Sequence, residues 1–369
     1  MKLLVQPGDG IGPLVKAIEK AKKSIQIVIF RFDRLEVEKA LEDAVKRGVA
    51  VHALIAFTNR GGEKNLRKLE MRFLERGVTV ARTADDLVRY HGKMMIVDGK
   101  ELHLLAFNYT QIDIERSRSF AVITRDKQLV KEAEELFDCD CKRQPYKPGS
   151  ARFLVSPLNA REQLARFIKG AKKELLIYDV KISDRAMIRL LEERAKDGVE
   201  IRAIGKITRH NSQISIRQLP KLRLHTRTFV RDHKDAFIGS QSLRELELDS
   251  RREMGVIFRD DHAIARITKI FQEDWKAGVV GALDEADDVV KPPAAKVAKK
   301  VAKSVTKTFP PVAPVVEEAM RNVLKVGNGV PIDRDEVEEN VQIAVKQAVK
   351  QAVREVVEDV VEQQREPEA

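Results

Sequence analysis

Cysteines, aromatic residues and long apolar runs are all scarce in this sequence of 369 residues. Its two cysteines, Cys139 and Cys141, are too few for a disulfide framework or a tetrahedral zinc site, so we expect plain thiols, with a redox-active Cys-x-Cys pair as the alternative. No stretch approaches about 18 consecutive apolar residues, and the apolar run at the start is too short for a signal peptide. These absences predict a soluble, cytoplasmic protein, and they leave peripheral contact with a membrane open.

Acidic residues are missing from residues 291–308, where six lysines contribute +6, whereas residues 333–369 carry eleven acids against five bases and contribute −6. The segment between them is balanced, so the first 290 residues hold the whole net charge of +11. A basic region of this size favours an anionic partner: nucleic acid, anionic lipid or another phosphodiester. The alternative is that this charge serves solubility alone.

An internal repeat organises the first 290 residues. Residues 21–30 (AKKSIQIVIF) match 171–180 (AKKELLIYDV), and 47–55 match 197–205, both at an offset of 150. Later the offset falls to 134, so the second half lacks sixteen residues where the first half has a predicted helix. Each half alternates β-branched runs with amphipathic segments, which predicts an α/β layered domain.

The predicted elements follow this periodicity. In the first half we expect strands at 25–30, 49–56, 78–82, 94–97 and 102–107, and helices at 12–22, 36–47, 63–76 and 127–137. In the second half we expect strands at 174–180, 199–204, 222–230, 235–239 and 254–258, and helices at 159–170, 184–196 and 261–277.

The composition changes beyond about residue 285, which predicts four segments: two α/β halves (1–145 and 146–285), a Lys/Pro-rich linker (286–334) and a Val-rich helix (335–369). Valines recur every four residues from Val337 to Val361 and form one apolar stripe. A valine-rich helix needs a partner surface, so we expect self-association through residues 335–364, with packing onto the core as the alternative. The acidic polar face without aromatics argues against a membrane-surface helix.

The most informative feature is a motif that occurs twice, His91-Gly-Lys93-Met-Met-Ile-Val-Asp98 and His225-Thr-Arg227-Thr-Phe-Val-Arg-Asp232. Positions i and i+2 of a strand face the same way, so each copy would present an imidazole beside a cation. One neutral imidazole can attack phosphorus while a second, protonated one donates a proton, and the cations hold the phosphoryl oxygens. This scheme requires no metal or other cofactor. Asp98-Gly99 predicts a hairpin turn. We therefore expect Asp98 and Asp232 at strand ends, as structural groups or as supports for the residues that bind substrate.

Here the sequence resembles the phospholipase D superfamily, whose mark is a duplicated H-x-K-x4-D motif, commonly followed by G-S-x-N and a later acid. The resemblance covers about residues 1–280. It implies two similar phospholipase D-like α/β/α sandwich halves that form one bilobal core, with the helical tail outside it. It also implies one site between the halves, a phosphohistidine intermediate, and metal-free hydrolysis or phosphatidyl transfer.

The family pattern carries over unevenly. His91, Lys93, Asp98 and Asn108 match in half one, where Leu105 and Ala106 replace Gly-Ser and Ser119 replaces the later acid. In half two His225, Asp232, Gly239, Ser240 and Glu253 match, while Arg227 replaces lysine and Ser242 replaces asparagine. The pattern implies His91 as nucleophile, Glu253 as its partner and His225 as general acid. Asp113 and Glu115 are the candidates to replace the acid that is missing at Ser119.

Three functions are consistent with these residues. The favoured one is a phosphodiesterase acting on a phospholipid, by hydrolysis or by transfer as in cardiolipin synthases. A nuclease of the same superfamily is the second; the basic core supports it, but the 5% content of aromatic residues does not. The third is a catalytically weak protein that binds phosphate or an anionic polymer, because Arg227 and Ser119 depart from the pattern.

Overall fold

A computed structural model describes residues 1–57, 63–84, 87, 89–208 and 213–280. These residues belong to one compact unit. The predicted linker at 286–334 and the predicted helix at 335–369 lie outside the described residues, and both stay predictions.

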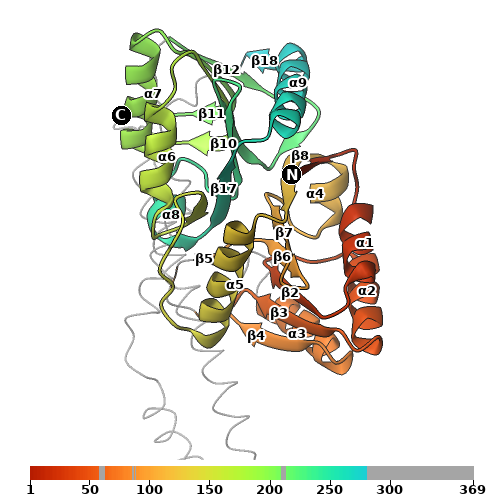
Figure 1. Ribbon diagram of the computed structural model, residues 1–369. Helices are drawn as coiled ribbons and strands as arrows, with labels where there is room; N and C mark the ends of the chain where they lie inside the picture. The colour runs from red at the N-terminus through yellow and green to blue at the C-terminus, as the bar shows by residue number, and fades with distance from the viewer. Residues whose placement is uncertain (58–62, 85–86, 88, 209–212, 281–369) are drawn as a thin grey trace, which may run out of the picture. The chain divides into compact units, whose positions relative to one another are not determined.

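Half one is a mixed sheet with helices on both faces (Figure 1). Its strands are, in spatial order, β1 (Lys2–Gln6), β8 (Ser117–Thr124), β7 (Glu101–Leu105), β6 (Met94–Val97), β2 (Ser24–Ile29), β3 (Ala50–Ile55) and β4 (Thr79–Arg82). Helices α1 (Gly12–Lys20), α2 (Leu35–Lys46) and α3 (Glu63–Glu75) cover one face, α5 (Lys127–Lys142) covers the other, and the short α4 (Gln111–Glu115) precedes β8.

Half two repeats this order. Its strands are β9 (Phe153–Val155), β17 (Met254–Phe258), β15 (Asp235–Gly239), β14 (Arg227–Arg231), β10 (Glu174–Ile182), β11 (Glu200–Ile207), β12 (Ile214–Gln218) and β18 (Val279–Val280). Helices α6 (Ala160–Lys169) and α7 (Arg185–Lys196) lie on one face and α9 (Asp261–Ala277) on the other, with α8 (Glu245–Asp249) in the place of α4 (Figure 1). The described residues contain no counterpart of α3, which agrees with the change of offset from 150 to 134.

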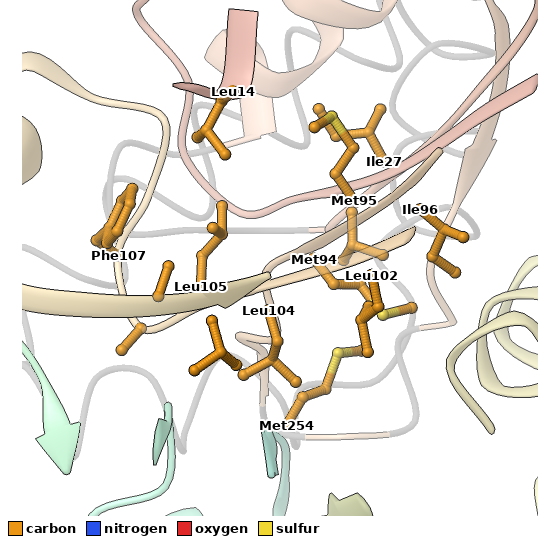
Figure 2. Packing of buried hydrophobic residues seen from close by; sticks show 14 of the residues in the cluster. Leu14, Ile27, Met94, Met95, Ile96, Leu102, Leu104, Leu105, Phe107 and Met254 are labelled. Carbon is orange, nitrogen blue, oxygen red and sulfur yellow. The ribbon is translucent and has the colours of Figure 1, made fainter. Parts of the chain in front are cut away.

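The central strands are apolar on both sides because helices cover both faces of each sheet. In β2, for example, Ile27, Val28 and Ile29 are all fully buried, although successive side chains point to opposite faces. The main apolar cluster also includes residues of half two: Met254 packs in the same cluster as Met94 and Leu104 (Figure 2). The two halves therefore share part of one core.

Short strands cross reciprocally between the halves. β5 (Arg89–Tyr90) pairs in parallel with β16 (Arg251–Arg252), and β13 (Arg223–Leu224) pairs in parallel with the start of β8. These pairings bring the segment that precedes each motif histidine to the other half. The backbone N–H of His91 then donates to the carbonyl oxygen of Arg252 at 2.7 Å, and that of His225 to the carbonyl oxygen of Arg118 at 3.1 Å.

Two matching arginine–aspartate pairs also stabilise the junction. Arg118 donates to both carboxylate oxygens of Asp274, at 2.6 and 2.9 Å, and Arg252 donates to Asp140 at 3.1 Å. All four side chains are largely buried, so these pairs are less screened than surface ion pairs. Because each pair joins one half to the other, the pairs hold the two motif segments in register.

The motif aspartates bind backbone on their own half. The Asp98 carboxylate accepts the N–H groups of Lys22, Lys23 and Ser24 at 2.7–3.1 Å, and Asp232 accepts those of Lys172, Lys173 and Glu174 at 2.7–3.2 Å. Asp98 and Asp232 also have φ angles of 56° and 51°, in the left-handed region that aspartate and asparagine tolerate. Each aspartate therefore fixes a hairpin turn to the loop that enters the neighbouring strand.

We expect Asp98→Asn and Asp232→Asn each to lower the free energy of unfolding by about 1–2 kcal/mol, because asparagine keeps the turn but loses the charge that strengthens these hydrogen bonds. Urea unfolding measures this loss, with Asp138→Asn, a change of an exposed carboxylate on α5, as the control. Unchanged midpoints in both variants would contradict the anchoring role.

The predicted α/β architecture is confirmed, and several boundaries were wrong. Helix α5 ends at Lys142 rather than at residue 137, and the predicted strand 222–230 is two strands, because His225 and Thr226 are not in strand conformation. Strands β1, β8, β9 and β12 and the helices α4 and α8 were not predicted. Most of these elements span only three to five residues, too few for a periodicity to be seen.

Candidate active site

The motif histidines stand just before strands rather than within them. Strand β6 begins at Met94, after Lys93, and β14 begins at Arg227 itself. The sequence argument of two side chains on one face of a strand was therefore wrong in its local structure. It nevertheless brought together the right groups, because the Lys93 ammonium lies 2.9 Å from Nε2 of His91.

His91 is held between a carboxylate and a cation. Its Nδ1 lies 2.8 Å from Oε2 of Glu253, which belongs to half two and is completely buried. An ionised carboxylate can only accept a hydrogen bond, so Nδ1 carries the proton and Nε2 keeps its lone pair. That lone pair accepts the N–H of Lys93. Phe30 contacts both residues: its ring meets the imidazole edge-on at 4.7 Å and lies 5.6 Å from the ammonium.

Gly92, between the histidine and the lysine, packs closely against Met254 of half two. A Cβ at this position would lie 2.6 Å from the sulfur of Met254, the residue after Glu253. Thr226 takes this position in half two, where Phe120 stands in the place of Met254. The absence of a side chain at Gly92 therefore leaves room for the end of the Met254 side chain, and Met254 directly follows Glu253, which lies between β16 and β17.

In half two, the cation of the motif is held by neutral and acidic side chains. Arg227 donates from Nε to the hydroxyl of Ser242 at 2.8 Å, and its Nη2 lies 3.4 Å from Glu247. The backbone N–H of Ser242 also donates to Glu247, at 2.8 Å. Asp179, nearly fully buried on β10, accepts the N–H of Leu243 at 2.8 Å, and burial raises the pKa of Asp179 to about 6.

His225 has a different environment from His91. Its Nδ1 lies 3.3 Å from Oδ2 of Asp113, outside hydrogen-bond alignment, and the hydroxyl of Ser119 makes no hydrogen bond within the described structure. Asp113 accepts the backbone and side-chain N–H groups of Asn108 at 2.8 and 2.7 Å, and it pairs with Arg223. Glu115, the other candidate, pairs instead with Arg34 at 2.8 Å.

The remaining predicted site residues divide into two groups. Ser240 exchanges hydrogen bonds with the backbone of Met254, beside Glu253, and thus belongs with Asn108 and Ser242 near the cluster. Asp98 and Asp232 accept hydrogen bonds from the backbone described above, which is the structural place expected for them at the strand ends. Glu247 and Asp179 were missed, although Glu247 stands five residues after Ser242, as Asp113 does after Asn108.

The cluster is largely buried, and this burial shifts the pKa values of its members. Burial, followed by the charges of Lys93 and Arg227, lowers the pKa of both His91 and His225 well below the usual value. Burial likewise lowers the pKa of Lys93 well below its usual range, and it raises that of Glu253. A bound phosphodiester anion would oppose the pKa shifts of these three basic groups, so the cluster favours an anion.

Other candidate chemistry is weaker. Burial raises the pKa of Cys141 to about 12, and Cys139 is shifted in the same direction, so neither thiol is an activated nucleophile. Among the residues that the structure describes, no group of three histidine, cysteine, aspartate or glutamate side chains is arranged to hold a metal ion. In the same part of the chain, no helix combines the length and the apolar content needed to cross a bilayer.

A family model described as cardiolipin synthase, phospholipase D-like domain, matches residues 14–141 and 164–275, one segment in each half. The chain belongs to the phospholipase D superfamily. This membership places it among the phospholipase D-like phosphodiesterases. The resemblance stated from the motif residues is therefore confirmed.

The sequence identity to individual relatives is low. The chain is 27% identical over 128 residues to a mitochondrial cardiolipin hydrolase of Danio rerio, which is 34% of this chain and 53% of that protein, so it spans about half the length of this curated relative. Similar solved structures include a polyphosphate kinase from Porphyromonas gingivalis (TM-score 0.62, 19% identity, 74% of this chain and 50% of that one). A phosphatidylserine synthase from Haemophilus influenzae has a TM-score of 0.60 at 11% identity and covers 83% of this chain and 93% of its own. Identities this low show the fold alone.

Proposed function

We propose that the protein breaks a phosphodiester bond in two steps through a covalent adduct on His91, without a metal, and that its substrate is a phospholipid. The observation that carries this proposal is the contact between His91 and Glu253 across the two halves. It fixes the proton on Nδ1 and aims the lone pair of Nε2 toward Lys93, where a phosphoryl group would bind. An imidazole held in this tautomer is a nucleophile at neutral pH.

Cleavage and release are two successive displacements at phosphorus. Nε2 of His91 attacks phosphorus, the bond to the leaving oxygen breaks, and His225 gives its proton to that oxygen. Lys93 moves from Nε2 to a non-bridging oxygen, and Arg227 stabilises the same developing charge. His225, now neutral, takes a proton from water or from an alcohol, whose oxygen displaces His91. Water gives hydrolysis and an alcohol gives transfer.

The pH dependence follows from the depressed pKa values. The first step needs one neutral and one protonated imidazole, and at neutral pH the free enzyme holds both mainly neutral. Lowering the pH first adds one proton to the pair and then a second, so kcat/KM is expected to reach its maximum below about pH 6.5. Initial rates between about pH 4 and pH 9 measure this profile, and a maximum at or above about pH 7.5 would contradict it.

The substrate is tested by incubating the protein with chelator on three substrates: labelled phospholipid vesicles, single-stranded DNA and RNA. We expect release or transfer of a lipid head group, and His91→Ala is the matched control. Turnover of nucleic acid alone would replace the lipid substrate by a nuclease function. Salt-sensitive binding without turnover would leave only the binding protein. Loss of activity that metal restores would contradict the metal-free scheme.

A further inference from the structure

The two histidines of the site are unequally supported, although the halves are related by a constant offset. His91 and His225 are 134 positions apart, and the same offset relates Ser119 to Glu253. The reciprocal strand pairs place Ser119 next to His225 in the same way that Glu253 lies next to His91. A serine hydroxyl cannot reach as far as a glutamate. Both the Ser119 hydroxyl and Nδ1 of His225 are consequently buried without a hydrogen bond in the described structure.

A different carboxylate approaches His225 from helix α4. Oδ2 of Asp113 lies 3.3 Å from Nδ1 of His225, and only 2% of the Asp113 side chain is exposed. Three groups hold this carboxylate: the backbone N–H and the side-chain amide of Asn108, and the guanidinium of Arg223. Arg223 also donates to the hydroxyl of Ser117 at 2.9 Å, so it is fixed on the far side as well. The carboxylate is therefore anchored where an imidazolium could turn to meet it.

We propose that Asp113 is the positioning residue for His225 and that it replaces the acid missing at position 119. The proposal rests on the proposed function, because it assigns Asp113 a part in proton donation to the leaving group. The two atoms lie 3.3 Å apart, and such catalytic contacts commonly shorten when substrate binds. His225 needs an acid to hold its proton because burial, followed by the charges of Lys93, Arg227, Arg223 and His91, lowers its pKa.

A carboxylate beside a histidine favours the protonated form, so Asp113 determines how much of His225 carries the proton. Removing its charge in Asp113→Asn lowers the pKa of His225 further and moves the pH maximum of kcat/KM to lower pH. Ser119→Glu installs the missing acid, so it raises the pKa of His225 and moves the pH maximum of kcat/KM to higher pH. A purely structural role for Asp113 would move neither maximum.

The experiment measures pH profiles and first-turnover rates of four proteins: wild type, Asp113→Asn, Ser119→Glu and the double variant. At about pH 7 we expect Asp113→Asn to cut the first-turnover rate at least about tenfold with an alkyl leaving group, but less than about threefold with a nitrophenyl one, which needs no proton. The double variant is expected to recover most of the loss. Glu115→Gln on the same helix is the matched control and keeps the wild-type profile, since this exposed carboxylate pairs with Arg34.

Failure of the role proposed for Asp113 and failure of the proposed function give different results. Equal losses with both leaving groups, or no recovery in a folded double variant, would overturn the role of Asp113. If Asp113→Asn does not fold, Ser119→Glu alone decides, because an unchanged pH maximum in that variant also overturns the proposal. Absence of phosphodiester turnover in the wild-type protein is a different failure, which removes the proposed function itself.

Discussion

Replacement of His91 by alanine is expected to lower kcat/KM for phosphodiester cleavage by about a thousandfold or more, because no second nucleophile can take its place. We do not expect His225 to substitute, since its Nδ1 lies 3.3 Å from Asp113 without a hydrogen bond, whereas Glu253 holds Nδ1 of His91 at 2.8 Å. Lys93 loses its hydrogen-bond acceptor in the variant but stays beside Phe30. Steady-state kinetics on a labelled phosphodiester measure the loss.

His103→Ala is the matched control, because it removes a buried histidine of half one that binds Glu101 and lies outside the cluster. It is expected to lower stability but to keep activity within a few-fold of the wild type in the folded protein. Retention of more than about a tenth of the wild-type rate in His91→Ala would exclude this histidine as the nucleophile.

Replacement of His225 by alanine is expected to lower cleavage of an alkyl phosphodiester by about a hundredfold to ten-thousandfold, the range of general acid catalysis. A nitrophenyl phosphodiester should behave differently, because nitrophenolate leaves without a proton. Its first bond cleavage stays fast, but the adduct on His91 then lacks the base that activates water. We therefore expect a burst of about one nitrophenolate per site followed by slow turnover.

Stopped-flow absorbance measures this burst, and the wild-type protein under the same conditions is the control. Equal losses on the alkyl and nitrophenyl substrates, without a burst, would show that His225 is not the proton donor. A fast burst followed by slow hydrolysis of the adduct is specific to loss of His225, since a variant that only disordered the site would also slow the release of nitrophenolate.

Much of this fold is predictable from the sequence because the sequence contains an internal repeat. The matching segments at offsets of 150 and 134 fix two similar α/β halves, and the long amphipathic helices and apolar strands stand out by periodicity. Gly48 and Gly77, with φ angles of 83° and 78°, follow the ends of α2 and α3, the position where glycine commonly ends a helix. The short α4 and α8 could not be seen, because five residues show no helical period.

The site was predictable in composition but not in arrangement. The repeated motif identifies His91, Lys93, His225 and Arg227, and the resemblance adds Glu253, which the structure places against His91. The crossing of β5 and β13 to the opposite halves depends on tertiary packing between residues more than 100 positions apart, and no local sequence pattern predicts it. For the same reason the sequence left Asp113 and Glu115 as equal candidates. The structure separates them, because Asp113 lies 3.3 Å from His225 whereas Glu115 pairs with Arg34.

The covalent adduct is the central claim, and trapping it is the most direct test. His225→Ala mixed with a nitrophenyl phosphodiester is denatured at alkaline pH, where a phosphorus–nitrogen bond survives, and its peptides are analysed by mass spectrometry. We predict one adduct per chain, stable in alkali and labile in acid, on the peptide that contains His91. An unmodified His91 peptide after a full burst, or an adduct on another residue, would contradict the account.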